Sequence, residues 1–180
     1  MTNKLIKVSL VEDDRGTREK LLAVLGNAPS LRCLQAYPSG EEALLKIEND
    51  VPDVVLMDIN LPGMSGIQCV GQLKLKLPKV QALMLTTYED SKLIFDSLRA
   101  GASGYLLKNM PPAEVVQAVE QVSTGGSPMS MAIARKVVDH FQQIKQAPTE
   151  LDQLSKREQE ILALLAKGFL YKEIADQLGI

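Results

Sequence analysis

Hydrophobic residues in this chain fall into short apolar runs that alternate with segments in which apolar positions recur every three or four residues. Runs of four to eight apolar residues between Gly, Pro or Asn positions indicate strands, whereas the three-to-four spacing indicates helices. Five strands are predicted on this basis, at residues 5–11, 31–37, 54–58, 80–85 and 103–107. A helix is predicted after each of them, at residues 21–28, 41–49, 67–77, 89–100 and 112–122.

Five successive βα units predict an α/β fold with a parallel sheet, because each crossover returns the chain to a parallel strand. Helices then cover both faces of the sheet, as in a doubly wound fold. Spacing alone does not fix the strand order. In the flavodoxin-like order 2-1-3-4-5, which we expect here, the first and third strands are neighbours. Their carboxyl ends then flank the crevice in which ligands of such sheets bind.

Helix-end signals agree with these boundaries. Ser39 and Glu42 have the S-x-x-E form of a capping box. Gly101 follows the fourth predicted helix, where a left-handed residue commonly ends a helix. Two prolines, Pro111 and Pro112, lead into the fifth, and proline is tolerated at a helix start.

The third predicted strand ends in a single acid. Residues 54–57 are all apolar, as expected for a strand buried on both faces, and a loop of Asn, Pro, Gly and Ser follows Asp58 at once. An acid at the carboxyl end of a parallel strand is a candidate reactive group. Asp is also a common turn residue. From this stretch alone, both interpretations of Asp58 remain open.

Other strands of the predicted sheet also end in polar side chains, namely Glu12, Asp13, Thr86, Thr87 and Lys108. In the flavodoxin-like order they would converge with Asp58 on one pocket. Clustered carboxylates repel one another and either raise a pKa or recruit a cation, and such oxygen ligands suit Mg²⁺. A lysine ammonium and a threonine hydroxyl would contact phosphoryl oxygens, and an Asp carboxylate can itself accept a phosphoryl group. Thr86 is the expected hydroxyl; Thr87 is the alternative if the strand register differs by one residue.

Beyond residue 123 the composition changes. A Gly/Ser/Pro-rich break at 123–128 precedes a predicted helix at 129–145 and a linker at 146–149. The apolar stripe of this helix is typical of a packing or dimer face and consists of Ile133, Val137, Val138, Phe141 and Ile144. We therefore predict a domain at 1–123, a helical linker at 124–150 and a small helical segment at 151–180.

The last segment contains two predicted helices. Ser155 and Glu158 form a second S-x-x-E capping box before a helix that runs to Gly168. A shorter helix is predicted at 171–178, with Gly179 after it.

Charge and cysteine content limit the function classes. The formal charge is −2, and residues 123–180 carry seven Lys/Arg and seven Asp/Glu, which is not a finished DNA-binding surface. Cys33 and Cys69 stand in apolar settings without a CxxC motif, as expected for reduced core residues of a cytoplasmic protein. No signal peptide or membrane-length apolar run is present in the sequence, so we expect no membrane partner. His140 is predicted to lie on the surface and not to donate phosphate.

Residues 4 to about 123 resemble the receiver domain of two-component response regulators. Four motifs carry the resemblance: Val11-Glu12-Asp13-Asp14, LMDINLPGMSG at 56–66, Thr86, and GASGYLLK at 101–108. The resemblance implies that Asp58 accepts phosphate from a phosphohistidine of a sensor histidine kinase. It also implies a phosphoacceptor with slow self-dephosphorylation, and not a dedicated enzyme.

The same resemblance assigns the cofactor. Asp13 and Asp58 would hold Mg²⁺ together with the backbone carbonyl of Asn60, and Glu12 would act through metal-bound water.

Three further residues receive roles from the resemblance. Thr86 would follow the phosphoryl oxygen, Tyr105 would be the aromatic side chain whose position reports the switch, and Lys108 would pair with the phosphate. Many receivers have a proline after this lysine, where this chain has Asn109. Whether the peptide between Lys108 and Asn109 is cis is therefore open, because a non-proline cis bond costs about 2.5 to 4 kcal/mol.

The C-terminal segment resembles the start of the LuxR-type helix-turn-helix domain of NarL/FixJ regulators, through LSKREQEIL at 154–162 and KEIADQLGI at 172–180. In a helix-turn-helix the second helix enters the major groove. The helix predicted at 171–178 would be the first of the pair, so we expect no DNA-binding residue, and little DNA affinity, in these 180 residues. In the complete protein, phosphorylation would control DNA binding and transcription, and it could also produce a homodimer.

Three functional hypotheses follow. The first is a phosphorylation-controlled DNA-binding regulator that lacks the end of its output domain. The second is a receiver that works through protein–protein contacts alone. The third treats Asp58-x-Asn60 as a phosphatase-type nucleophile site, which is disfavoured because such sites usually carry an acid where this chain has Asn60.

Overall fold

The centre of the molecule is a five-stranded parallel sheet in the order β2-β1-β3-β4-β5, which confirms the predicted flavodoxin-like order. The structure is a computed structural model that describes residues 5–146, 155–166, 173 and 177–178. The strands are β1 (Ile6–Val11), β2 (Leu31–Tyr37), β3 (Val54–Met57), β4 (Gln81–Thr86) and β5 (Gly104–Leu107). Each begins and ends within one residue of its prediction.

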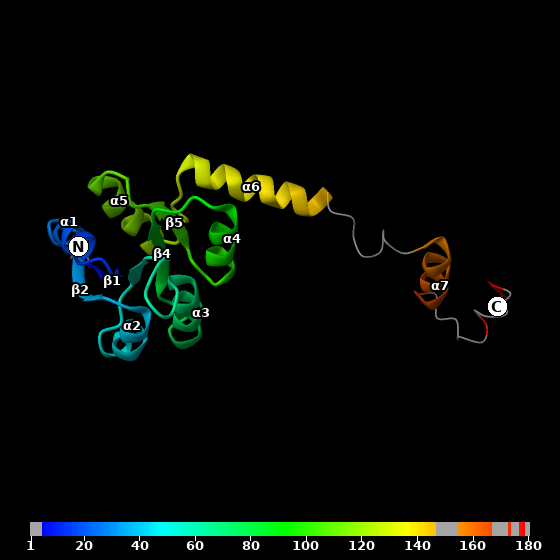
Figure 1. Ribbon diagram of the computed structural model, residues 1–180, viewed down its shortest axis with the longest axis horizontal. Coiled ribbons are helices and arrows are strands. Elements are labelled where there is room, and N and C mark those ends of the chain that lie inside the picture. Colours follow the sequence, from blue (N-terminus) through cyan, green and yellow to red (C-terminus); the bar gives the residue numbers. More distant parts are fainter. Residues whose placement is uncertain (1–4, 147–154, 167–172, 174–176, 179–180) are drawn as a thin grey trace. The chain divides into compact units, whose positions relative to one another are not determined.

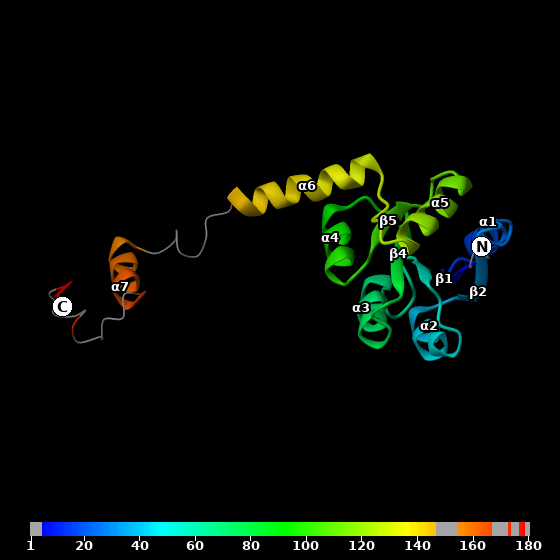
Figure 2. The ribbon, with the colours of Figure 1, turned by 180° about the vertical axis from the view of Figure 1, so that it is seen from behind.

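The helices that connect the strands cover both faces of the sheet (Figure 1). They are α1 (Arg15–Gly26), α2 (Gly40–Lys46), α3 (Gly66–Lys76), α4 (Ser91–Arg99) and α5 (Pro112–Ser123). Side chains of α1 and α5 pack in one hydrophobic cluster, and those of α2, α3 and α4 pack in the other, so the two sets lie on opposite faces (Figure 2). The second predicted helix is split, because its last residues form a short 3₁₀ helix, η1 (Ile47–Asn49).

Strand β3 lies at the middle of the sheet and is fully buried. Val54 and Leu56 belong to the cluster under α1 and α5, whereas Val55 and Met57 belong to the cluster on the other face. This alternation is the period of two along a strand, and it explains why the sequence reads as a continuous apolar run. A buried β3 fixes the position at which the chain emerges as Asp58.

Helix caps set several of the turns that join helices and strands. The Ser39 hydroxyl accepts the Glu42 amide, as predicted for the start of α2. A full capping box that we did not predict starts α3, where Ser65 and Gln68 each accept the other's backbone N–H. Gly101 has φ +106°, which confirms the left-handed residue expected after α4.

The first compact unit continues past α5 into helix α6 (Met131–Gln146) and ends at Val137. The amide of Tyr105 in β5 donates to the carbonyl of Pro128 at 3.0 Å, so the segment before α6 pairs with β5. Gly104 permits this approach, because a Cβ there would lie 2.7 Å from the same carbonyl oxygen. Ile133 is fully buried against the sheet.

The predicted apolar stripe of α6 therefore divides. Ile133 and Val137 pack against the core of the first unit, whereas Val138 and Phe141 are exposed. The side chain of Ile144 lies outside the described residues.

In the second unit, helix α7 (Lys156–Ala166) begins as predicted. The Ser155 hydroxyl accepts the Glu158 amide at 3.3 Å, and the Glu158 carboxylate accepts the Ser155 amide at 2.7 Å, which confirms the capping box. The linker predicted at 146–149 lies, after Gln146, outside the described residues, as does most of the helix predicted at 171–178. Among the described helices, none is long and apolar enough to cross a bilayer.

Candidate functional site: an acidic cluster at the carboxyl edge of the sheet

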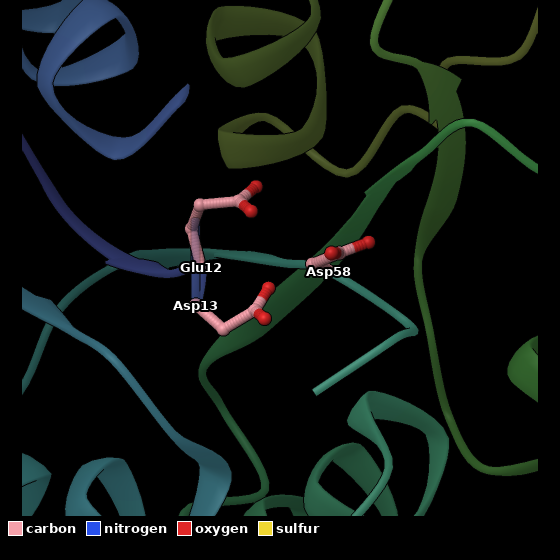
Figure 3. Close-up of side chains that lie close together, drawn as sticks. All are labelled: Glu12, Asp13 and Asp58. Atoms are coloured by element: carbon pink, nitrogen blue, oxygen red, sulfur yellow. The ribbon is translucent and has the colours of Figure 1, made fainter. Parts of the chain in front are cut away.

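Three carboxylates meet where two neighbouring strands end. Val11 of β1 lies opposite Met57 of β3, so the residues that follow these strands, Glu12 and Asp58, emerge side by side. An oxygen from each of Glu12, Asp13 and Asp58 lies within 4.8 Å of the other two (Figure 3). In this view the Asp13 side chain points toward Asp58. The structure thus brings together the three acids that the sequence placed at this edge.

Lys108, which follows β5, contacts two of these acids directly. Its Nζ lies 2.8 Å from Asp58 Oδ2 and 2.7 Å from Glu12 Oε2. Both carboxylates are almost completely buried, and the lysine side chain is 17% exposed. One cation therefore neutralises only part of the charge of three acids, which leaves the pocket with a formal charge of about −2 if all are ionised.

The pKa values reflect this arrangement. Burial raises the pKa of Glu12, although its hydrogen bond to Lys108 acts in the opposite direction. For Lys108, burial alone would lower the pKa, but the hydrogen bonds and charges of Asp58 and Glu12 together outweigh it and raise the pKa. The lysine is therefore held in its charged form at neutral pH.

Thr86 and Tyr105 both contact the loop between β4 and α4, which we call the β4–α4 loop (residues 87–90). The buried Thr86 hydroxyl accepts the Tyr88 amide at 3.4 Å, and the Tyr105 hydroxyl donates to the Tyr88 carbonyl at 2.9 Å. The Tyr105 ring is fully buried. Thr87, the alternative hydroxyl, is exposed. The peptide between Lys108 and Asn109 is trans.

The backbone around Asp58 is held by several hydrogen bonds. Asp58 N–H donates to the carbonyl of Val11, and Asp58 Oδ1 accepts the amide of Ile59 at 2.8 Å. Gly66, at the start of α3, packs directly on the Asp58 carbonyl. Asn60 lies in the exposed part of the loop that follows β3, two residues beyond the phosphoacceptor candidate.

Two charged residues that the sequence did not single out support the loops of the site. Arg18 of α1 donates to the carbonyls of Glu12 and Asp13 at 2.7 and 2.9 Å. Glu41 of α2 accepts the amide of Met64 in the β3–α3 loop at 2.7 Å. These contacts join residues that are 5 to 23 positions apart, so no local sequence signal indicates them.

The donor set fits Mg²⁺ on chemical grounds. Carboxylate oxygens are hard ligands, and an octahedral ion with bonds of about 2.1 Å needs ligand oxygens about 3 to 4.2 Å apart. The spacing of at most 4.8 Å among Glu12, Asp13 and Asp58 is close to that range. A divalent cation would also offset the residual negative charge of the pocket.

Comparison with known proteins agrees with this geometry. The family described as the response regulator receiver domain matches residues 8–120, and the family described as bacterial regulatory proteins, luxR family, matches residues 152–180. The transcriptional regulatory protein LnrK of Bacillus subtilis is 37% identical over 98% of this chain and 84% of its own length. The DNA-binding transcriptional activator DevR/DosR of Mycobacterium tuberculosis is 31% identical over 97% of this chain and 80% of its own.

A solved structure extends the agreement to the fold. The LuxR-family two-component response regulator of Aurantimonas sp. aligns with a TM-score of 0.72 and 29% identity over 76% of this chain and 98% of that one. The chain therefore belongs to the two-component response regulators that combine a receiver domain with a LuxR-type DNA-binding domain.

Proposed function

We propose that Asp58 accepts a phosphoryl group from the phosphohistidine of a sensor histidine kinase. The observation that carries this proposal is the contact of Lys108 Nζ with Asp58 Oδ2, within an acidic cluster that fits Mg²⁺. An Asp58 oxygen would attack phosphorus, the P–N bond would break, and the released imidazole would take up a proton. The product is an acyl phosphate on Asp58.

Asp13 and Asp58 would hold the metal with the carbonyl of Asn60, and Glu12 would act through metal-bound water. When bound, Mg²⁺ would neutralise the charge on the transferring phosphoryl oxygens. Lys108 would move its ammonium from the Asp58 carboxylate to a phosphoryl oxygen. Thr86 would donate its hydroxyl to another phosphoryl oxygen, and Tyr105 would change position with the β4–α4 loop.

The test is incubation with a small acyl phosphate and Mg²⁺, followed by intact-mass measurement. We expect a gain of one phosphoryl group on the parent chain and none on Asp58→Asn, which keeps the shape but removes the nucleophile. Equal labelling of the two proteins would reject Asp58 as the acceptor. Sustained hydrolysis of small phosphate esters would instead support a dedicated enzyme, which the proposal excludes apart from slow self-dephosphorylation.

The LuxR-family match supports transcription control as the output, with DNA as the target. A regulator of this kind would act in the cytoplasm, and phosphorylation could also produce a homodimer. We expect the 180-residue chain itself to bind DNA weakly, because residues 123–180 carry equal numbers of acidic and basic side chains. Fluorescence anisotropy with a labelled duplex at low salt tests this expectation. Tight, salt-dependent binding would refute it.

The alternative is a receiver that acts through protein contacts only. The two proposals differ in a longer form of the chain that includes a complete helix-turn-helix. Salt-dependent DNA binding by that form, increased by phosphorylation, would support the transcriptional role, and its absence would favour the alternative.

A further inference from the structure

The first two turns of α6 are built into the receiver. Ile133 is fully buried in the same cluster as Tyr105, and Val137 packs against that cluster. The segment before α6 pairs with β5 at Tyr105 through the carbonyl of Pro128. The start of the helix that leaves the receiver therefore packs with the side chain that contacts the β4–α4 loop.

Lys136 adds a direct link from α6 to that loop. Its Nζ donates to the backbone carbonyl of Glu89 and lies 3.7 Å from the Glu89 carboxylate. The lysine side chain is 34% exposed and the glutamate 51% exposed, so the contact lies at the surface and can open without disturbing the core.

Three contacts consequently hold consecutive peptide groups of the β4–α4 loop. The Tyr88 amide donates to Thr86, the Tyr88 carbonyl accepts Tyr105, and the Glu89 carbonyl accepts Lys136. Each peptide group is planar and shares a Cα atom with the next, so a displacement at Tyr88 is passed to the peptide that carries the Glu89 carbonyl unless the φ and ψ angles of Glu89 absorb it. Of the three, the contact with Thr86 is the longest, at 3.4 Å.

We propose that the contact between Lys136 and Glu89 is a latch that holds the start of α6 on the receiver and opens when Asp58 is phosphorylated. This inference rests on the proposed function, since the Thr86 hydroxyl must turn to the phosphoryl group and release the Tyr88 amide. The loop then shifts and the hydrogen bond from Lys136 to the Glu89 carbonyl breaks. The residues of α6 that follow Ile133 are then held less tightly on the receiver.

Deuterium exchange of peptides covering residues 131–137 tests the latch in the full chain. Beryllofluoride with Mg²⁺ serves as the acyl-phosphate mimic. We expect the mimic to speed exchange of these peptides about two- to fivefold, the range for opening a surface ion pair. Lys136→Met should reach the faster rate without the mimic, whereas Lys136→Arg should keep the parent rate. Lys79→Met, at the opposite end of β4, serves as the matched control and should also keep the parent rate.

Thermodynamic linkage between the latch and phosphorylation allows a second measurement, the affinity for beryllofluoride. If phosphorylation weakens the latch, then breaking the latch must favour the phosphorylated conformation by the same factor. Lys136→Met should therefore lower the beryllofluoride concentration for half-saturation by up to about fivefold, and Glu89→Gln, which keeps the backbone carbonyl and removes only the carboxylate charge, should lower it less.

Unchanged exchange at residues 131–137 on adding beryllofluoride, or slower exchange, would overturn the latch. Unchanged half-saturation in both variants would do the same. Mass labelling of Asp58 separates this failure from failure of the proposed function. A parent chain that takes no phosphoryl group refutes both. A chain that is labelled but whose exchange at residues 131–137 does not change refutes the latch alone.

Discussion

Gly66 packs so closely on Asp58 that a Cβ at position 66 would lie 1.8 Å from the Asp58 carbonyl oxygen. No side chain fits at that distance. The first residue of α3 therefore constrains the backbone of the phosphoacceptor candidate. A hydrogen bond from the Gly66 amide to the carbonyl of Ile59, at 2.9 Å, also holds the start of α3 close to this loop.

Gly66→Ala should consequently destabilise the fold and displace Asp58. We expect the free energy of unfolding to fall by about 1 to 3 kcal/mol, the usual cost of overpacking. Acyl-phosphate labelling of Asp58 should slow at the same time. Gly71→Ala in the same helix is the matched control, because nothing lies within 4 Å of its Cβ position. That change should be neutral or stabilising by up to about 1 kcal/mol. Urea denaturation of both variants provides the measurement, and equal effects would contradict the steric argument.

Lys108→Met should weaken folding and strengthen metal binding. Two buried carboxylates would lose their shared cation, so we expect a loss of about 1 to 3 kcal/mol in metal-free buffer, below the full cost for a completely buried pair. Removing a positive charge beside the acids should tighten Mg²⁺ binding in a calorimetric titration. Lys46→Met breaks an exposed pair with Glu42 and should change stability by less than about 1 kcal/mol. Weaker Mg²⁺ binding by Lys108→Met would argue against a shared site.

The buried hydroxyl of Tyr105 predicts a pH-dependent contribution to stability. Burial, with nearby negative charges, raises its pKa from 10.0 to about 12. The folded state thus holds the proton more tightly than the unfolded state, so the contribution is complete below pH 10 and is lost between pH 10 and 12. Tyr105→Phe should cost about 1 kcal/mol at neutral pH, and its difference from the parent should shrink over that window in denaturation measurements. A constant difference up to pH 12 would contradict the raised pKa.

The two thiols should differ in reactivity. Burial raises the pKa of Cys69 to about 12, whereas Cys33 is only partly buried and has a smaller upward shift. Since the thiolate is the nucleophile, iodoacetamide at pH 8 should modify Cys33 first and Cys69 only on unfolding. Peptide mass spectrometry in the absence and presence of urea distinguishes the two. Fast labelling of Cys69 in the native protein would show that the α2–α3 contact around it opens readily.

Much of the fold was predictable, because a strand that is buried on both faces appears in the sequence as a continuous apolar run. The length and apolar composition of the run from Val54 to Met57 predicted a strand covered on both faces, and the structure has a fully buried strand there. The meeting of Glu12, Asp13 and Asp58 followed from the position of each acid at a strand end together with the strand order. The order itself was an expectation that the sheet confirms.

Some features of the structure were not predicted, and most of them are contacts between residues that are not neighbours in the sequence. The capping box of Ser65 and Gln68 was readable, since S-x-x-Q has the required form, but it was overlooked. The contacts of Arg18, Glu41 and Lys136 were not readable, because each joins a side chain to a backbone group brought near only by the folded chain. The 3₁₀ end of α2 likewise has no local signal that we recognise.

The pairing of Pro128 with Tyr105 affects where an isolated receiver fragment should end. β5 is an edge strand of the sheet, and the 128–129 segment pairs with part of its outer hydrogen-bonding side. A fragment cut after Ser123, the last residue of α5, would expose that side of β5 and also the core residues that pack with Ile133. Unpaired strands of this kind template self-association. The unit that should remain monomeric in isolation therefore ends within α6, beyond the point at which the receiver family match stops.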